Sequence, residues 1–321
     1  MKHRRSNRKL WIAIIILSLL LAGSWLSRAK RAEADYPRDE APKLEETWSY
    51  GSGDIKVVRI PLQGVIMHPE DEGLFSARVD MVSSTLMQIR AAERDPDVRA
   101  IILEVNSPGG GVTPSDEIYD ALSRFRKSRP DRRIVVFIRD LGASGAYYAS
   151  MASDWIIAEP TAVVGSVGVI MQSMNLQGLA EKIGITDVTI KSGANKDMLN
   201  PFEPVNTNQV ALLQKLIDDM YARFSGLVID NRKMDPATAS GLLDGRIFSA
   251  NDALENGLID EIGYWDEALA RTAALLDTGA LYVIRYEAPK SLLESLLGTR
   301  SPVTLPKLNL SSPTFLYLWK P

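Results

Sequence analysis

The apolar residues of this chain follow two different patterns. Residues 10–26 form one continuous apolar run. From residue 55 onward, short runs rich in β-branched residues alternate with stretches in which apolar side chains recur every three or four positions. Residues 99–105 (RAIILEV) are one of the short runs rich in β-branched residues. In residues 210–227, apolar side chains recur every three or four positions, which is typical of an amphipathic helix. This alternation predicts an α/β domain with largely parallel strands over residues 55–285.

The run at residues 10–26 is long enough to cross a membrane. Its seventeen residues would rise about 26 Å as a helix, close to the thickness of the hydrocarbon core. Trp11 and Trp25 stand near its two ends, where indole rings prefer the membrane interface. Residues 1–9 are basic and contain no acid, so this leader is expected in the cytoplasm. We therefore expect a single-pass cell-membrane protein with a transmembrane signal anchor and an extracytoplasmic main domain.

A cleavable signal peptide is the alternative interpretation of the same run. The sequence Ala-Glu-Ala at residues 32–34 matches the Ala-x-Ala pattern of a signal-peptide cleavage site. However, the apolar stretch is long for a signal peptide, and Arg28, Lys30 and Arg31 follow it. Such charges are typical of a segment that stops in the membrane, so the uncleaved anchor is the preferred interpretation.

Two segments beside the predicted domain lack a regular pattern. Residues 27–54 are polar and contain Pro37 and Pro42, which is typical of a flexible linker. Residues 286–321 are interrupted by several prolines and are expected to form an extended tail. Within this tail, residues 315–319 (FLYLW) are strongly apolar and should dock on another surface.

Composition and charge exclude several classes of function. The chain has no cysteine, so thiol catalysis, disulfides and thiolate metal sites are excluded. Its two histidines cannot form a His-Glu-x-x-His zinc pair, and no phosphate-binding loop is present, so we expect no metal and no cofactor. The first 31 residues hold eight basic side chains and no acid, so a net charge of −3 for the whole chain leaves −11 on residues 32–321. An acidic domain is a poor nucleic-acid binder, so no nucleic-acid partner is expected.

A serine and a lysine stand out against this background. Ser144 lies in a run of glycine and alanine (GASGAYY), and Lys196 follows in a later Lys-Ser-Gly-Ala-Asn-Lys-Asp run. His68 is the only histidine outside the basic leader, so a nucleophilic serine would need another base, and lysine is the usual substitute. A lysine works as a base only when it is neutral, so we expect the neighbouring Asp197 carboxylate to point away. A Gly/Ala-rich helix start and an exposed loop lysine are the plain alternatives.

Two glycine-rich strings could serve such a nucleophile. Residues 106–111 (NSPGGG) close a predicted buried strand, and a glycine turn there can aim a backbone N–H at a ligand oxygen. Residues 165–168 (GSVG) contain Ser166, which could hold the lysine amine or could cap the backbone. A short strand is expected at residues 188–191, leading to the Lys196 loop.

Four strings in this order, NSPGGGV, GASGAYYAS, VVGSVGVIM and IKSGANKDML, resemble the signal peptide peptidase A family. The resemblance is to the short, single-domain form of these bacterial membrane-anchored peptidases, and it covers about residues 55–285. It implies a crotonase-like fold, a spiral of ββα units related to the Clp protease. It also implies a homo-oligomer, a ring of eight copies in which serine and lysine approach from adjacent protomers.

The resemblance also implies roles for individual residues. Ser144 matches the nucleophile and Lys196 the general base. The backbone amides of Gly110 and Gly145 match the oxyanion hole, and Ser166 matches a serine that contacts the lysine. The implied substrates are remnant signal peptides and other apolar peptides at the extracytoplasmic face of the membrane.

Three other functions remain open at the level of sequence. A protease of intact membrane proteins would use the same chemistry. A non-catalytic membrane scaffold could keep the fold, although the Ser144 and Lys196 pair argues against it. An acyl-CoA hydratase or isomerase shares the fold class, but its substrates are cytoplasmic.

The apolar tail is expected to behave like a substrate. Exposed apolar area costs about 25 cal/mol per Å², so the tail should be bound somewhere. A groove built for extended apolar peptides is one acceptor, and there the enzyme would slowly trim the tail. A strand or plug at a subunit interface is the alternative.

Overall fold

The computed structural model describes residues 44–68, 80–287 and 316–318. The expected leader (residues 1–9), the anchor (residues 10–26) and most of the tail lie outside these ranges. Within them, no helix combines the length and the apolar character needed to cross a membrane.

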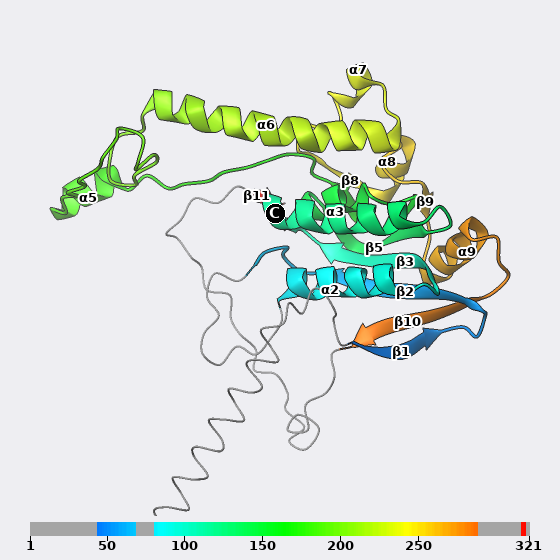
Figure 1. Ribbon diagram of the computed structural model, residues 1–321. Helices are drawn as coiled ribbons and strands as arrows, with labels where there is room; N and C mark the ends of the chain where they lie inside the picture. The colour runs from blue at the N-terminus through cyan, green and yellow to red at the C-terminus, as the bar shows by residue number, and fades with distance from the viewer. Residues whose placement is uncertain (1–43, 69–79, 288–315, 319–321) are drawn as a thin grey trace, which may run out of the picture. The chain divides into compact units, whose positions relative to one another are not determined.

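The core of the described chain is a mixed, mostly parallel sheet, as the alternating pattern predicted (Figure 1). In spatial order its strands are β1 (Glu45–Tyr50), β10 (Leu281–Glu287), β2 (Ile55–Gln63), β3 (Val98–Ser107), β5 (Arg133–Ala143), β6 (Trp155–Ala158) and β9 (Glu261–Ile262). Along this path only the pair of β1 and β10 is antiparallel. Beyond β6, the short strand β7 (Val163–Gly165) pairs parallel with the end of β5, and β8 (Ile247–Ser249) pairs antiparallel with β7.

The central strands are largely apolar, and both faces of the sheet are covered. In β3, Ile101 and Leu103 belong to one buried cluster, whereas Ala100 and Ile102 belong to another. The first cluster packs under helices α2 (Met81–Arg94) and α3 (Val112–Ser128), and the second packs against α9 (Trp265–Leu275). Burial on both faces explains why these strands read as continuous apolar runs.

The first strand corrects one sequence expectation. Residues 45–50, which fall within the expected flexible linker at residues 27–54, form β1 and pair with β10. Most β1 side chains are exposed, so this edge strand carries no alternation of buried and polar positions that could reveal it.

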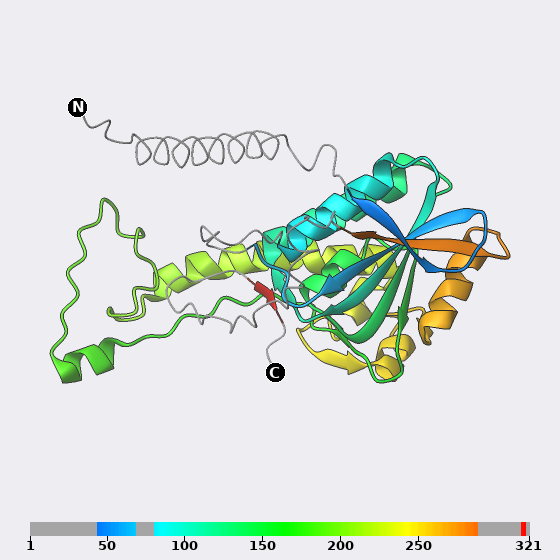
Figure 2. The same ribbon diagram turned by 90° about the horizontal axis from the view of Figure 1, so that it is seen from below.

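Residues 172–206, here called the arm, leave the sheet after β7. The arm carries the short helix α5 (Gln177–Ile183) and returns through the long helix α6 (Thr207–Arg232), as both ribbon views show (Figures 1 and 2). Two small helices, α7 (Pro236–Ala239) and α8 (Ala250–Glu255), follow α6. The strand expected at residues 188–191 is not formed, since no other described strand pairs with it. Val188 and Ile190 are instead 81% and 97% exposed.

Candidate active site

Ser144 occupies a sharp turn between β5 and the helix α4 (Gly145–Ser150). Its φ of 55° and ψ of −118° are unusual for a residue with a side chain and cost about 1–3 kcal/mol. Two backbone hydrogen bonds hold this conformation: the Ser144 amide donates to the Gly165 carbonyl over 2.7 Å, and the Ser144 carbonyl accepts from the Tyr148 amide over 2.8 Å. In α/β-hydrolases, a strained turn between a strand and a helix also holds the nucleophilic serine. The sequence around Ser144 lacks the Gly-x-Ser-x-Gly motif of those enzymes.

The glycine strand β4 (Gly109–Gly111) lies next to this turn. On one edge, the Gly109 carbonyl accepts from the Ile66 amide over 2.8 Å, and the Gly111 amide donates to the Ile66 carbonyl over 2.7 Å. Because hydrogen-bonding groups alternate along a strand, the Gly110 amide faces the opposite edge. A methyl group on Gly145 would lie 3.1 Å from the Gly110 nitrogen, so these two glycines are close together.

Ser166 lies beside Ser144, because each serine directly follows one of two adjacent strands, β7 and β5. Ala143 in β5 is directly paired with Gly165 in β7, so Ser144 and Ser166 follow paired positions in parallel strands. Adjacent strands are about 4.8 Å apart. Ser166 also has a positive φ, of 52°, and is buried. The structure therefore brings Ser144, Ser166 and the two glycines together.

Lys196 is not part of this cluster within one chain. It belongs to the arm, between α5 and α6, and is exposed. Of the residues that the structure describes, none forms a hydrogen bond with the Lys196 amine or with the Ser144 hydroxyl. His68 is occupied elsewhere: its Nε2 lies 3.0 Å from Glu117 Oε2, and its Nδ1 lies 3.5 Å from Asp80 Oδ1.

The loop that carries Lys196 is organised by ion pairs. Lys191 Nζ lies 2.8 Å from Asp197 Oδ2 and 3.6 Å from Glu203 Oε2. The hydrogen bond from Lys191 lowers the pKa of the Asp197 carboxyl, and the same bond raises the pKa of Lys191. The Asp197 carboxylate is thus paired with Lys191.

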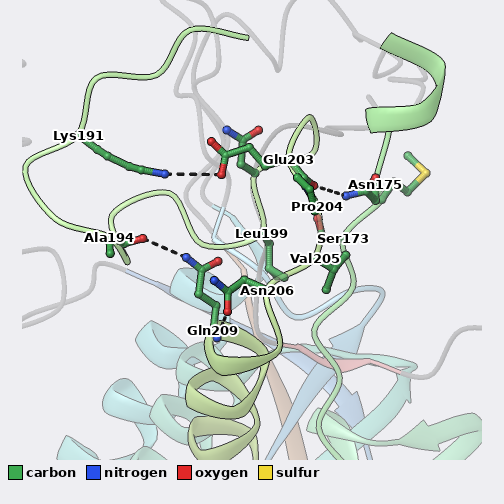
Figure 3. Close-up of a pocket in the computed structure, with 12 residues that line it drawn as sticks. Ser173, Asn175, Lys191, Ala194, Leu199, Glu203, Pro204, Val205, Asn206 and Gln209 are labelled. Atoms are coloured by element: carbon green, nitrogen blue, oxygen red, sulfur yellow. Dashed lines mark hydrogen bonds and ion pairs between the residues drawn. The ribbon is translucent and has the colours of Figure 1, made fainter. Parts of the chain in front are cut away.

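A cavity of about 540 Å³ lies within the same part of the arm (Figure 3). Lys191 and Ala194 line it from one side, and the Gln209 side chain, at the start of α6, donates to the Ala194 carbonyl over 3.0 Å. None of the residues clustered around Ser144 lines this cavity. Within one chain, this cavity beside the lysine loop is therefore separate from the residues clustered around Ser144.

The apolar tail docks on the glycine strand. Residues 316–318 form β11 (Leu316–Leu318), which pairs antiparallel with β4 and sets Tyr317 opposite Gly110. A methyl group on Gly109 would lie 2.2 Å from the Tyr317 carbonyl oxygen and 2.5 Å from the Gly145 amide nitrogen. That carbonyl thus lies at the edge where the Gly110 and Gly145 amides meet, which agrees with the first of the two docking places expected for the tail.

Comparison with known proteins identifies similar chains. A family model described as peptidase family S49 matches residues 126–278, which include Ser144, Ser166 and Lys196. A protein of Enterococcus faecium named as a signal peptide peptidase SppA is 39% identical over 225 residues, which are 70% of this chain and 65% of that protein. A protein of Methanocaldococcus jannaschii named as a protease is 33% identical over 236 residues, covering 73% of this chain and 75% of that protein.

A longer relative matches over a smaller share of its own length. Protease 4 of Salmonella typhi is 30% identical over 216 residues, which are 67% of this chain and 34% of that protein. The matched part therefore spans just under two thirds of the Enterococcus relative and about one third of Protease 4.

Proposed function

The chain belongs to peptidase family S49, the signal peptide peptidase A family of serine peptidases, and from this membership we propose that it is an endopeptidase with a Ser–Lys dyad. Ser144 is the nucleophile and Lys196 the general base. One observation carries the assignment of the serine: Ser144 is held in a strained turn beside the two glycine amides, where the tail already lies as an extended strand. Strain of this kind is retained where function needs it.

The proposed chemistry follows from these groups. The neutral Lys196 amine removes the Ser144 hydroxyl proton as the oxygen attacks the peptide carbonyl. The amides of Gly110 and Gly145 stabilise the oxyanion of the tetrahedral intermediate. The resulting ammonium then donates its proton to the leaving amine, and water hydrolyses the acyl-enzyme by the same steps. Ser166, next to Ser144, is suited to orient the lysine amine.

The lysine in this proposal comes from a neighbouring copy. Lys196 belongs to the arm. The arm extends away from the sheet of its own chain (Figures 1 and 2). Apolar arm residues are exposed in one chain, including Ile183 (61%), Val188 (81%) and Ile190 (97%). Their burial against a second chain would stabilise association and supply the missing base. We extend the proposal to the assembly, a ring of eight copies. In this proposal, the peptidase domain of each copy has the crotonase-like fold, a spiral of ββα units.

The proposed substrates are extended apolar peptides. The tail strand Leu316–Leu318 is such a peptide and uses the edge of β4 for main-chain pairing. The apolar run at residues 10–26 supports a membrane anchor with the peptidase domain extracytoplasmic. Remnant signal peptides, which are apolar and lie in the membrane, fit such an enzyme, and segments of intact membrane proteins are the alternative substrates.

Labelling and turnover test the proposal together. The full-length chain in detergent should react with a fluorophosphonate probe and cleave a fluorogenic apolar peptide. Ser144→Ala should lose both signals while its oligomer size and circular dichroism stay the same. Labelling of Ser144→Ala at the wild-type level would show that another residue is the nucleophile.

A further inference from the structure

A row of charged side chains crosses four adjacent strands on the face of the sheet that α9 covers. The second buried cluster includes one apolar residue from each of β2, β3, β5 and β10: Val57, Ile102, Phe137 and Val283. Side chains two residues apart in a strand share a face, so the next positions on this face hold three arginines and one glutamate. These are Arg59, Glu104, Arg139 and Arg285. The face under α9 therefore changes from apolar to charged along these strands.

The sheet divides beside this row. The pairing of β10 with β2 ends at Ile284, opposite Val58. Beyond this point β2 continues in register with β3, whereas β10 stays paired with β1 as far as Glu287. Pro61 lies in this part of β2 and has no N–H to donate to a further strand. The carboxyl ends of β2 and β10 therefore separate.

A cavity of about 450 Å³ lies between the separated strands. The charged row lines it, together with Ser84 and Gln88 of α2. A volume of about 300–1,000 Å³ is typical of sites for small molecules. Gln88 is 7% exposed, and its side-chain oxygen has no hydrogen-bond partner among the described residues. A buried acceptor of this kind is normally completed by a ligand or by water.

Arg59 is held in one orientation within the row. Its Nε and Nη2 lie 2.8 and 2.7 Å from Glu104 Oε2, and the Glu104 side chain is 4% exposed. The guanidinium carbon also lies 4.2 Å from the centre of the Trp265 ring. Pairing with a carboxylate and stacking on an indole both fix a planar guanidinium. Within the described ranges its Nη1 makes no hydrogen bond, so these donors can serve a ligand.

Arg139 and Arg285 stand on either side with less compensation. Arg139 is 45% exposed, and its ion-pair distances are long, 3.4 Å to Glu104 and 3.9 Å to Glu159. Arg285 is exposed and forms no ion pair with another described residue. Burial alone would raise the pKa of Glu104, but Arg59, Arg139 and Arg285 lower it, so all three positive charges act at one place.

We propose that this cavity binds the phosphate group of a small anionic ligand, either a soluble phosphate compound or the head group of an anionic lipid. Three arginines and two glutamates line it, so the cavity is positively charged in a chain that is acidic outside its basic leader. Guanidinium groups bind phosphate through charge-assisted hydrogen bonds. Arginines on three strands reach a ligand from different directions, which suits a tetrahedral phosphate better than a planar carboxylate.

The cavity is separate from the proposed catalytic residues. Ser144, Ser166 and Lys196 are not among the residues that line it. The inference therefore does not depend on the proposed peptidase function, and its tests measure binding and stability instead of turnover.

Isothermal titration calorimetry tests the site in the full-length chain in a nonionic detergent. Inorganic phosphate and dihexanoyl phosphatidic acid are titrated separately at constant ionic strength. Arg285→Gln and Arg139→Gln should each weaken binding about tenfold, since each removes a charge-assisted hydrogen bond. Arg124→Gln removes the same charge from an exposed position of α3 and should bind like wild type. The proposal is overturned if wild type binds neither ligand, or if all three variants are weakened equally.

The two ligands distinguish the two sources of phosphate. A lipid site predicts that dihexanoyl phosphatidic acid binds more tightly than inorganic phosphate, because its glycerol backbone adds contacts in the cavity. Similar affinities indicate a soluble phosphate compound. Either result supports the phosphate site when Arg285→Gln weakens the binding.

Thermal unfolding supplies an independent readout. A ligand that binds only the folded chain raises its Tm by mass action. Phosphate should raise the Tm of wild type and of Arg124→Gln by the same amount, and that of Arg285→Gln by less. Because Arg285 is exposed, the variant should unfold at the wild-type Tm when phosphate is absent. An equal rise for wild type and Arg285→Gln contradicts the site, whether or not the chain is an active peptidase.

Discussion

Lys191 and Asp197 form an ion pair of 2.8 Å across the loop that carries Lys196. The pair raises the pKa of Lys191 and lowers the pKa of Asp197, so both groups stay charged around neutral pH. Asp197 directly follows Lys196, the proposed base, and an uncompensated carboxylate there would oppose its neutral form. In the proposed mechanism, Lys191 therefore keeps this charge from opposing catalysis.

The first prediction concerns the pH dependence of activity. Lys191→Ala should shift the pH profile of kcat/KM toward higher pH, because it leaves the Asp197 carboxylate unpaired next to the proposed base in the chain. The plateau at high pH should be largely retained. Initial rates between pH 6 and 10 with an apolar peptide measure this shift.

A matched variant controls for a structural effect in this loop. Lys191→Arg keeps the positive charge and should keep the wild-type profile. The role assigned to Lys191 is wrong if Lys191→Ala and wild type share one midpoint.

The second prediction concerns the origin of the dyad. Ser144→Ala and Lys196→Ala should each abolish turnover, whereas His68→Ala should retain most of it. When the two inactive chains are co-assembled, about a quarter of the sites should contain both intact residues in a randomly mixed ring. Peptide turnover by mixed rings, verified by mass spectrometry, measures the recovery. No recovery in verified mixed rings would place serine and lysine in the same chain.

The third prediction concerns the tail. Since Tyr317 lies opposite Gly110 with its carbonyl near the two amides, wild type should slowly cleave its own chain after Tyr317. Intact-mass spectra taken during storage should show the loss of residues 318–321. Ser144→Ala should keep its full mass over the same period. Identical full-length masses for both proteins after long incubation would contradict the prediction.

The fourth prediction concerns stability in acid. Burial alone would raise the pKa of Glu104, but hydrogen bonding and charge from Arg59, aided by Arg139, outweigh it and lower this pKa. Arg59 lies 2.7 Å from Glu104, whose side chain is 4% exposed. A carboxyl with a lowered pKa stabilises the fold above its unfolded pKa, and this contribution is lost as the pH falls through the folded value.

Urea unfolding measures this contribution through tryptophan fluorescence. Arg59→Met should reduce the free energy of unfolding at pH 7 by about 3 kcal/mol, because it leaves a buried carboxylate with weaker compensation. The variant should also lose less stability than wild type between pH 6 and 3. Parallel curves for the two proteins across this range would show that Glu104 does not cause the acid dependence.

Some elements could be predicted from sequence because their patterns were strong. Residues 99–105 are apolar at every position except Arg99 and Glu104, and they form the central part of β3. The edge strand β1 was missed because its side chains are mostly exposed. The strand expected at residues 188–191 has the right residues, but a strand also needs a partner for its backbone, and no described part of the chain supplies one.

For the candidate site too, some features could be predicted from the sequence and others only from the structure. The sequence by itself determined the available chemistry: no thiol, one histidine outside the leader, and a serine and a lysine in strings that resemble a peptidase family. Only the tertiary structure decided that Ser144 adopts a positive φ and that Ser166 lies beside it. It also decided that the tail pairs with the glycine strand and that Lys196 extends away on the arm. Strand register and long-range pairing produce these relationships between residues far apart in the chain, so no local sequence pattern can encode them.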